Sequence, residues 1–251
     1  MKLVPSTPHP IAIPVVLLLS LSLVPAQASE DHAQQPIGDY PDHGEPVPLE
    51  AHIMSKCPDA RDCLRTLIVP TMEQVSDKVD FHLSFIANIS DKSSDITCMH
   101  GPEECIGDSL ILCAENLPFK PDDASDPIRM PTIRSLGFAN CLLSTYQKVP
   151  AQPLVQDCAA EHGIDFDALN ACASRQEDDP KRGELSGLAL LRESAVHNAR
   201  LGIKTSCTVR LDEKLWCVHD DGVWRDCAKG ADGSTVPVLV EEVKRLWQER
   251  N

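Results

Sequence analysis

Eleven cysteines in 251 residues are the feature that most constrains how this chain can fold. A chain of this length buries a sizeable core without cross-links, so the cysteines are not needed merely to hold a small scaffold together. In an oxidising compartment most of them pair as disulfides. Because their number is odd, at least one thiol stays free, reacts, or bonds to another molecule.

The N-terminal residues indicate such a compartment. Lys2 precedes an apolar run at residues 11–23, and small residues follow at 26–28. This is the pattern of a secretory signal peptide, which we assign to residues 1–28. The run is shorter than the roughly 20 apolar residues that a membrane-spanning helix needs. We therefore expect no membrane anchor once the signal peptide is removed.

Charge and local composition narrow the expected partners. The chain has 23 basic and 38 acidic side chains and a formal net charge of −15 at pH 7. Nucleic acids and anionic lipid surfaces are therefore poor partners.

Residues 29–46 are acidic and proline-rich and contain no Lys or Arg, which is typical of a disordered linker. Asn88-Ile89-Ser90 is a glycosylation sequon, and a secretory route makes Asn88 a site of modification.

The spacing of apolar residues predicts a mixed α/β fold. The expected elements are, in order, a strand (47–54), a helix kinked at Pro70 (60–78), a strand (79–85), a cysteine-rich helical stretch, a helix (185–201), three short strands (205–211, 215–219, 223–227) and a final helix. A βαβ unit followed by αββα is the order of the thioredoxin fold. We expect its first half at 47–97, a helical cysteine-rich insertion at 98–180, and its second half at 181–251.

The most specific motif of the sequence is Cys98-Met99-His100-Gly101-Pro102-Glu103-Glu104-Cys105, followed by Cys113. Cysteine and histidine are zinc ligands, so a metal centre is one interpretation. We favour structural disulfides for Cys98, Cys105 and Cys113, because a secreted chain oxidises its thiols. His100 and Glu104 then form hydrogen bonds that hold the loop, and we expect no metal and no other cofactor.

This motif resembles the C-x-H-G-x-x-E-C signature of the gamma-interferon-inducible lysosomal thiol reductase family. Cys98, His100, Gly101, Glu104, Cys105 and the later Cys113 match the signature, whereas Asp108 stands where the signature has Asn. The resemblance extends over residues 47–250, weakly after Cys172. It implies a thioredoxin-like thiol-disulfide oxidoreductase that reduces protein disulfides in a lysosome, in a vacuole or outside the cell, with a small thiol as a candidate reductant.

The same family has a catalytic C-x-x-C pair at the start of the first helix, and here the spacing differs. Cys57 heads the helix, Ala60 stands at the second cysteine position, and the next cysteine is Cys63. If Cys57 is the N-cap, Cys63 lies about 9 Å further along the helix axis, too far for a disulfide. If Asp59 is the N-cap, Cys57 and Cys63 can pair. We favour the second arrangement, because Asp is a far better N-cap than Cys.

Cys57 is the expected nucleophile in either arrangement. It lies near the positive end of a helix, with Lys56 and Arg61 beside it, and positive charge favours the reactive thiolate. The thiolate attacks a substrate disulfide, and Cys63 resolves the mixed disulfide. The alternative is an inert structural bridge between Cys57 and Cys63.

Cys207 is the second candidate for the resolving thiol. Thioredoxin folds usually place a cis-proline before the third strand, facing the redox cysteines, but residues 205–208 contain no proline. A disulfide with Cys217 or Cys227 is the alternative for Cys207. We expect Cys217 and Cys227 to pair with each other across a turn, which leaves Cys207 as the odd thiol. The rival interpretation of the whole chain is a redox-inert thioredoxin-fold module with a binding or structural role.

Overall fold

The computed structural model describes residues 44–90, 95–121, 128–178 and 184–251. The chain divides into two units, Met1–Pro36 and Ile37–Asn251, and the description below concerns the second. The predicted signal peptide and residues 29–43 of the predicted linker lie outside the described residues.

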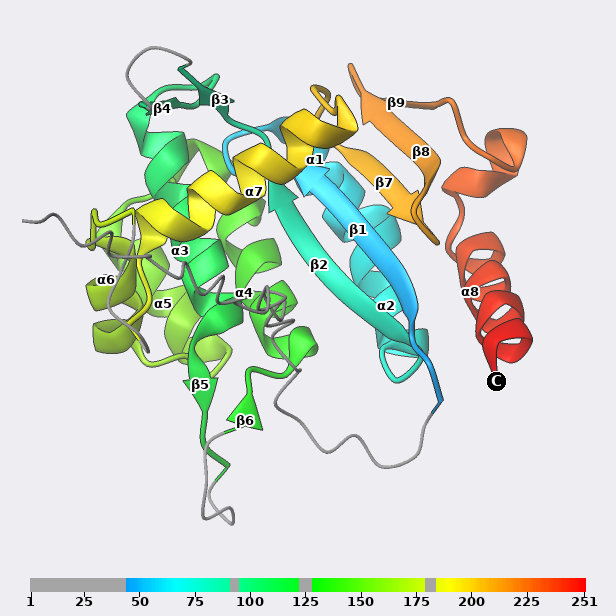
Figure 1. Ribbon diagram of the computed structural model, residues 1–251, viewed down its shortest axis with the longest axis horizontal. Coiled ribbons are helices and arrows are strands. Elements are labelled where there is room, and N and C mark those ends of the chain that lie inside the picture. Colours follow the sequence, from blue (N-terminus) through cyan, green and yellow to red (C-terminus); the bar gives the residue numbers. More distant parts are fainter. Residues whose placement is uncertain (1–43, 91–94, 122–127, 179–183) are drawn as a thin grey trace, which may run out of the picture. The chain divides into compact units, whose positions relative to one another are not determined.

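A five-stranded sheet lies at the centre of the described part of this unit (Figure 1). Its strands are β1 (Val47–Ile53), β2 (Val79–Phe85), β7 (Thr208–Leu211), β8 (Lys214–Asp220) and β9 (Val223–Arg225). Their spatial order is β2-β1-β7-β8-β9, with β1 and β2 parallel and every other neighbouring pair antiparallel. A βαβ unit extended by an antiparallel hairpin in this order is the thioredoxin-like topology, so the predicted fold class is confirmed.

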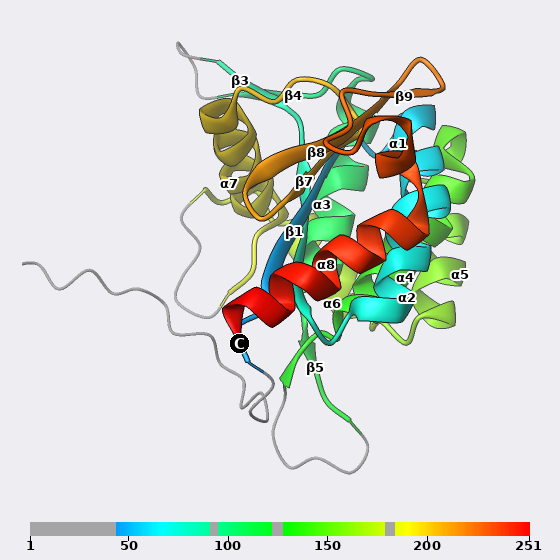
Figure 2. The same ribbon diagram turned by 90° about the vertical axis from the view of Figure 1, so that its right-hand side faces the viewer.

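Helices cover both faces of the sheet (Figures 1 and 2). α7 (Gly187–Leu201) lies on one face, and α2 (Val69–Val75) and α8 (Val236–Arg250) lie on the other. The Ser186 hydroxyl caps α7 by accepting a hydrogen bond from a backbone N–H of its first turn. Gly202 ends α7 in the left-handed conformation, with φ 68°, directly after the helix expected at residues 185–201.

The first helical stretch runs without a break from Pro58 to Val75 and changes type along its length. It begins as α1 (Pro58–Cys63), continues as the π-helical segment Leu64–Ile68 and ends as α2. In the wider π-type turn, the N–H of Val69 donates to the carbonyl of Leu64. Pro70, which has no N–H to donate, follows at once. The irregularity predicted at Pro70 is therefore a local widening of the helix.

Four α-helices lie between β2 and α7 in the described residues. They are α3 (Pro102–Asn116), α4 (Thr132–Ser144), α5 (Gln152–Glu161) and α6 (Phe166–Ala173). Disulfides join α3 to α6 through Cys113 and Cys172, and α4 to α5 through Cys141 and Cys158. The sequence predicts this stretch to be helical and cysteine-rich, but it does not give the bounds of the four helices.

Short elements complete the described part. Two-residue ladders pair β3 (Asn88–Ile89) with β4 (Ile96–Thr97) and β5 (Pro118–Phe119) with β6 (Ile128–Arg129), and 3₁₀ turns occur at Tyr146–Lys148 and Gly230–Ser234. The β5–β6 ladder lies in a stretch where no strand was expected. None of the described helices has both the length and the apolar character needed to span a bilayer. The predicted domain boundaries stay predictions.

Candidate redox site

Cys57 lies where the chain leaves β1 and enters the first helix. It is the N-cap of α1, with φ −100° and ψ 129°, and Pro58 is the first helical residue. Proline suits this position, because an N–H there has no partner within the helix. The expectation that Asp59 is the N-cap is therefore wrong. Asp59 lies inside the first turn, and its carboxylate accepts a hydrogen bond of 2.9 Å from the backbone N–H of Gly222.

The expected pair of Cys57 and Cys63 is not formed. Cys63 is fully buried and bonded to Cys207, with 6.3 Å between their Cα atoms. With Cys57 as the N-cap, the helix carries Cys63 about 9 Å along the axis and turns it by roughly 240° away. Among the described residues, which include all eleven cysteines, Cys57 is the free one. The expectation that Cys207 is the odd thiol is therefore also wrong.

The sulfur of Cys57 faces the segment that leads into β7. Its Sγ lies 3.9 Å from the carbonyl oxygen of Ser206, and the Ser206 hydroxyl accepts a 3.0 Å hydrogen bond from the N–H of Met54. The Ser206–Cys207 peptide bond is cis. Cys57 is 7% exposed, so a reaction partner has to reach the thiol through a small area of surface.

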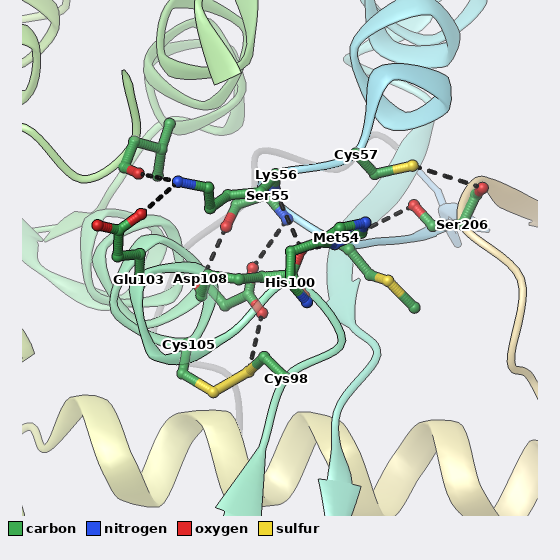
Figure 3. A network of polar contacts seen from close by, with 12 residues as sticks. Met54, Ser55, Lys56, Cys57, Cys98, His100, Glu103, Cys105, Asp108 and Ser206 are labelled. Atoms are coloured by element: carbon green, nitrogen blue, oxygen red, sulfur yellow. Dashed lines mark hydrogen bonds and ion pairs between the residues drawn. A yellow bond between two sulfur atoms is a disulfide. The ribbon is translucent and has the colours of Figure 1, made fainter. Parts of the chain in front are cut away.

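The motif from Cys98 to Cys105 lies against the backbone that precedes Cys57 (Figure 3). The N–H of Ser55 donates to Asp108 Oδ1 at 2.9 Å, and the Ser55 hydroxyl donates to the Glu104 carbonyl at 3.1 Å. The N–H of Lys56 donates to Glu104 Oε2 at 3.3 Å. These three bonds attach the loop that carries Cys57 to α3.

His100 orients the Glu104 carboxylate from the other side. Its N–H donates to Oε1 at 3.1 Å, and its ring Nδ1 lies 2.5 Å from Oε2. The Glu104 side chain is fully buried. A disulfide between Cys98 and Cys105 closes the loop around this pair. The motif thus supports the loop before Cys57, with Cys98 and Cys105 in a disulfide and His100 bonded to Glu104.

The two cations expected beside Cys57 are both engaged with acids. Lys56 Nζ lies 2.6 Å from a carboxylate oxygen of Glu103 and donates to the Val149 carbonyl at 2.8 Å. Arg61 forms two hydrogen bonds to the Asp62 carboxylate, of 2.8 and 3.0 Å. Positive charge near Cys57 is therefore partly neutralised, which the sequence analysis did not foresee.

Asp108, the residue that departs from the family signature, is fully buried on α3. Burial raises the pKa of its carboxyl well above the usual value, the hydrogen bond from Ser55 opposes this rise, and the nearby Glu104 adds to it. Its Oδ2 lies 3.8 Å from Cys98 Sγ. A protonated carboxyl offers one acceptor and one donor, as an Asn amide does. Asp108 accepts the Ser55 hydrogen bond with one carboxyl oxygen, and an Asn at this position could accept the same bond with its amide oxygen.

Gly107 allows α3 to approach this loop closely. A Cβ atom at this position would lie 2.4 Å from Val149 Cγ1 and 2.5 Å from the Ser55 hydroxyl oxygen. The sequence analysis missed Gly107, Ser55 and Ser206. A glycine inside a helical stretch is the signal that could have identified Gly107, whereas the two serines carry no such signal.

A histidine also missed by the sequence analysis links the hairpin to the first helix. His219 on β8 is buried, and its Nδ1 lies 2.8 Å from Asp59 Oδ1. Its backbone forms two 2.9 Å hydrogen bonds with the backbone of Cys207. His219 thus lies between the start of α1 and the backbone of Cys207, which is bonded to Cys63.

The sequence also predicts a second disulfide and a glycosylation site. Cys217 and Cys227 form a disulfide, the pair that the sequence analysis expects. Asn88 is exposed at the start of β3, and its glycosylation stays a prediction.

Comparisons with known proteins agree with the motif. Residues 48–162, which contain Cys57 and the signature, match the family described as gamma interferon inducible lysosomal thiol reductase (GILT). A "Gamma-interferon-inducible lysosomal thiol reductase-like protein" of Anopheles gambiae is 26% identical over 140 residues, or 52% of this chain and 56% of that protein. "GILT-like protein 1" of Drosophila melanogaster is 26% identical over 168 residues, or 62% and 60%. The chain thus matches less than two thirds of the length of these relatives.

Among solved structures, the chain is similar to alpha-DsbA1 of Wolbachia pipientis. The TM-score is 0.45 and the sequence identity is 14%, over 82% of this chain and 87% of that chain.

Proposed function

We propose that this chain is a divergent member of the gamma-interferon-inducible lysosomal thiol reductase family and a thiol-disulfide oxidoreductase with Cys57 as its nucleophile; the match of residues 48–162 to that family supports this. The observation that carries the proposal is that Cys57 has a free thiol. It is free, while the other ten cysteines are bonded in pairs. It also lies at the N-terminus of the first helix, and the family motif supports the loop before it.

The first step is an exchange of disulfide bonds. The Cys57 thiolate attacks one sulfur of a disulfide in a substrate protein, and a bond forms between them as the substrate's S–S bond breaks. The second substrate sulfur leaves as a thiolate and takes up a proton. The partial positive charge at the helix N-terminus favours the anionic sulfur of Cys57.

A second thiol has to release the substrate from Cys57. The sequence analysis assigned this role to Cys63 or, less favoured, to Cys207, but these two cysteines are bonded to each other. In our proposal a small thiol attacks the Cys57 sulfur of the mixed disulfide and releases the second substrate thiol. Another small thiol then regenerates Cys57. Two small thiols are oxidised to one disulfide for each substrate disulfide that is reduced.

The same proposal places the protein in the secretory pathway, with protein disulfides in a lysosome, in a vacuole or outside the cell as substrates. Three features support this location. They are the predicted signal peptide at residues 1–28, the disulfides that need an oxidising route of folding, and the exposed sequon at Asn88.

Catalysed reduction of insulin by a small thiol tests the function. We compare the wild type with Cys57→Ser and with the matched control Cys63→Ala/Cys207→Ala, at pH 5 and pH 7. We expect the wild type and the control to accelerate the reaction and Cys57→Ser to fall to the uncatalysed rate. If the wild type reduces insulin no faster than Cys57→Ser does, the redox-inert module is favoured. The low exposure of Cys57 is consistent with that alternative.

A further inference from the structure

Two histidines and a glutamate meet between β1 and α7, on the face of the sheet that α7 covers. Glu50 and His52 lie two residues apart on β1, so their side chains point to the same face. His197 on α7 contacts this pair, with its Nε2 2.8 Å from Glu50 Oε1. One nitrogen or oxygen atom from each of the three lies within 4.8 Å of the other two.

The hydrogen bonds of Asn198 determine which nitrogen of His52 carries a proton. The Asn198 amide nitrogen donates to the carbonyls of Phe85 and Ser194, at 3.0 and 2.9 Å. Its oxygen therefore faces His52 Nδ1, at 2.8 Å, and Nδ1 must be the donor. In neutral His52 the lone pair then lies on Nε2.

That lone pair is buried and points at a carboxylate. His52 is fully buried, and its Nε2 has no hydrogen-bond partner. The nearest acid is Glu50, whose Oε2 lies 3.4 Å from Nε2, within the range of an ion pair but without a hydrogen bond. Two acceptors that face each other repel, so this arrangement calls for a cation at Nε2.

From this geometry we propose that Glu50, His52 and His197 bind one Zn²⁺ ion. Imidazole nitrogen and carboxylate oxygen are zinc ligands, at about 2.0–2.2 Å from the metal, so ligand atoms about 3.3 Å apart suit a tetrahedral ion. Glu50 Oε1, which Arg210 leaves free, lies 2.8 Å from His197 Nε2, so these two side chains would move slightly apart to admit an ion. Oε2 of the same carboxylate lies 3.4 Å from His52 Nε2. The His52–Asn198 bond is the kind of outer contact that orients a ligating histidine.

The other contacts of the cluster leave one carboxylate oxygen of Glu50 for an ion. Arg210 pairs with Oε2 of Glu50, so Oε1 remains for the metal. Glu50 and His197 also line a pocket of about 370 Å³, from which water can supply a fourth ligand. The ion would attach α7 to β1, and the proposal does not depend on the chemistry of Cys57.

Zinc binding to the full chain tests the proposal. The Cys57→Ser variant serves as the parent, because its missing thiol removes an unrelated zinc ligand. After treatment with a chelator and dialysis against Zn²⁺, we expect one zinc per chain by elemental analysis, and Co²⁺ in its place should give the visible absorption of a tetrahedral site. His197→Gln should weaken zinc binding about tenfold or more. His162→Gln, which alters a histidine at the C-terminal end of α5 outside this cluster, should leave it unchanged.

The His197 side chain is 31% exposed, so His197→Gln is expected to fold, and circular dichroism verifies this. Absence of stoichiometric zinc in the parent overturns the proposal, as does full affinity in His197→Gln. If NMR then shows a proton on both nitrogens of His52, a proton rather than a metal satisfies Nε2. Binding of Ca²⁺ with equal affinity would also contradict a nitrogen-ligated zinc site.

Discussion

Asp108 shows how a single residue can depart from a family signature and keep its contacts. The signature has Asn at this position, and Asp108 accepts the hydrogen bond from Ser55 with one carboxyl oxygen. Because burial raises its pKa, the folded protein keeps the carboxyl protonated at pH values where the unfolded chain has lost that proton. The network before Cys57 is therefore sensitive to pH through one group.

Asp108→Asn should stabilise the protein at pH 7. The folded-state pKa is raised, so wild-type stability decreases as pH rises above the unfolded value of about 4, and Asn removes this dependence. We expect a gain of roughly 1–3 kcal/mol at pH 7 and none at pH 4. Urea unfolding at the two pH values measures the difference. An equal effect of the substitution at both would mean that Asp108 is ionised in the folded protein.

His82 is a second residue whose charge state differs from that of a free side chain. Hydrogen bonds to Asp80 and then Glu115 raise the pKa of His82 to about 10. We expect its ring to stay protonated up to pH 9, and an NMR titration of the ring protons measures this.

The stabilising effect of His82 follows from the same shift. Its pKa is raised above the unfolded value of about 6.5, so the stabilisation is complete below that pH and is lost as pH approaches 10. Because the side chain is 44% exposed, His82→Gln should cost less than about 1 kcal/mol at pH 6. A cost that grows between pH 6 and pH 10 would contradict this account.

At the scale of elements, the packing of α3 against the loop before Cys57 decides how the site is built. The sequence predicts these strands well, because β1 is a short apolar segment and apolar residues alternate with polar ones along β2, and Gly202 directly follows the last residue of α7. It did not predict α3, because the helix begins inside the cysteine motif, at Pro102. The role of the motif as support for that loop therefore became clear only from the structure.

Gly107→Ala should disturb this packing. The new Cβ would meet Val149 and Ser55 at 2.4 and 2.5 Å, so the helix or the loop has to move. We expect a loss of about 1–3 kcal/mol and faster alkylation of Cys57. The matched control is Gly137→Ala in α4, where the Cβ meets the ring of His162, a side chain that can rotate away. Equal alkylation rates in both variants would show that α3 does not restrain the loop.

At the scale of the whole molecule, one disulfide joins the two halves of the thioredoxin-like fold. Cys63 in the first helix and Cys207 at the entry to β7 are 144 residues apart in sequence. No local pattern reveals a pair so distant, and for this reason the sequence analysis paired Cys63 with Cys57. It paired Cys217 with Cys227 because only a turn separates them.

Removal of this bond should affect stability more than chemistry. A disulfide that closes a long loop restricts the unfolded chain, so Cys63→Ala/Cys207→Ala should lose about 2–4 kcal/mol by urea unfolding. Its Cys57 should still react with a thiol reagent. Loss of that reactivity in the folded double variant would assign a direct redox role to the Cys63–Cys207 pair.

The central claim is that Cys57 is a free, reactive thiol while Cys63 and Cys207 stay bonded to each other. Differential alkylation with peptide mass mapping of the folded protein, across a series of glutathione redox buffers at pH 5 and pH 7, tests it directly. We predict that Cys57 alone exchanges between a free and a glutathione-bound form, and that Cys63–Cys207 remains oxidised over the same range. A Cys57–Cys63 disulfide, or a Cys57 that no buffer or reagent modifies, would contradict the account.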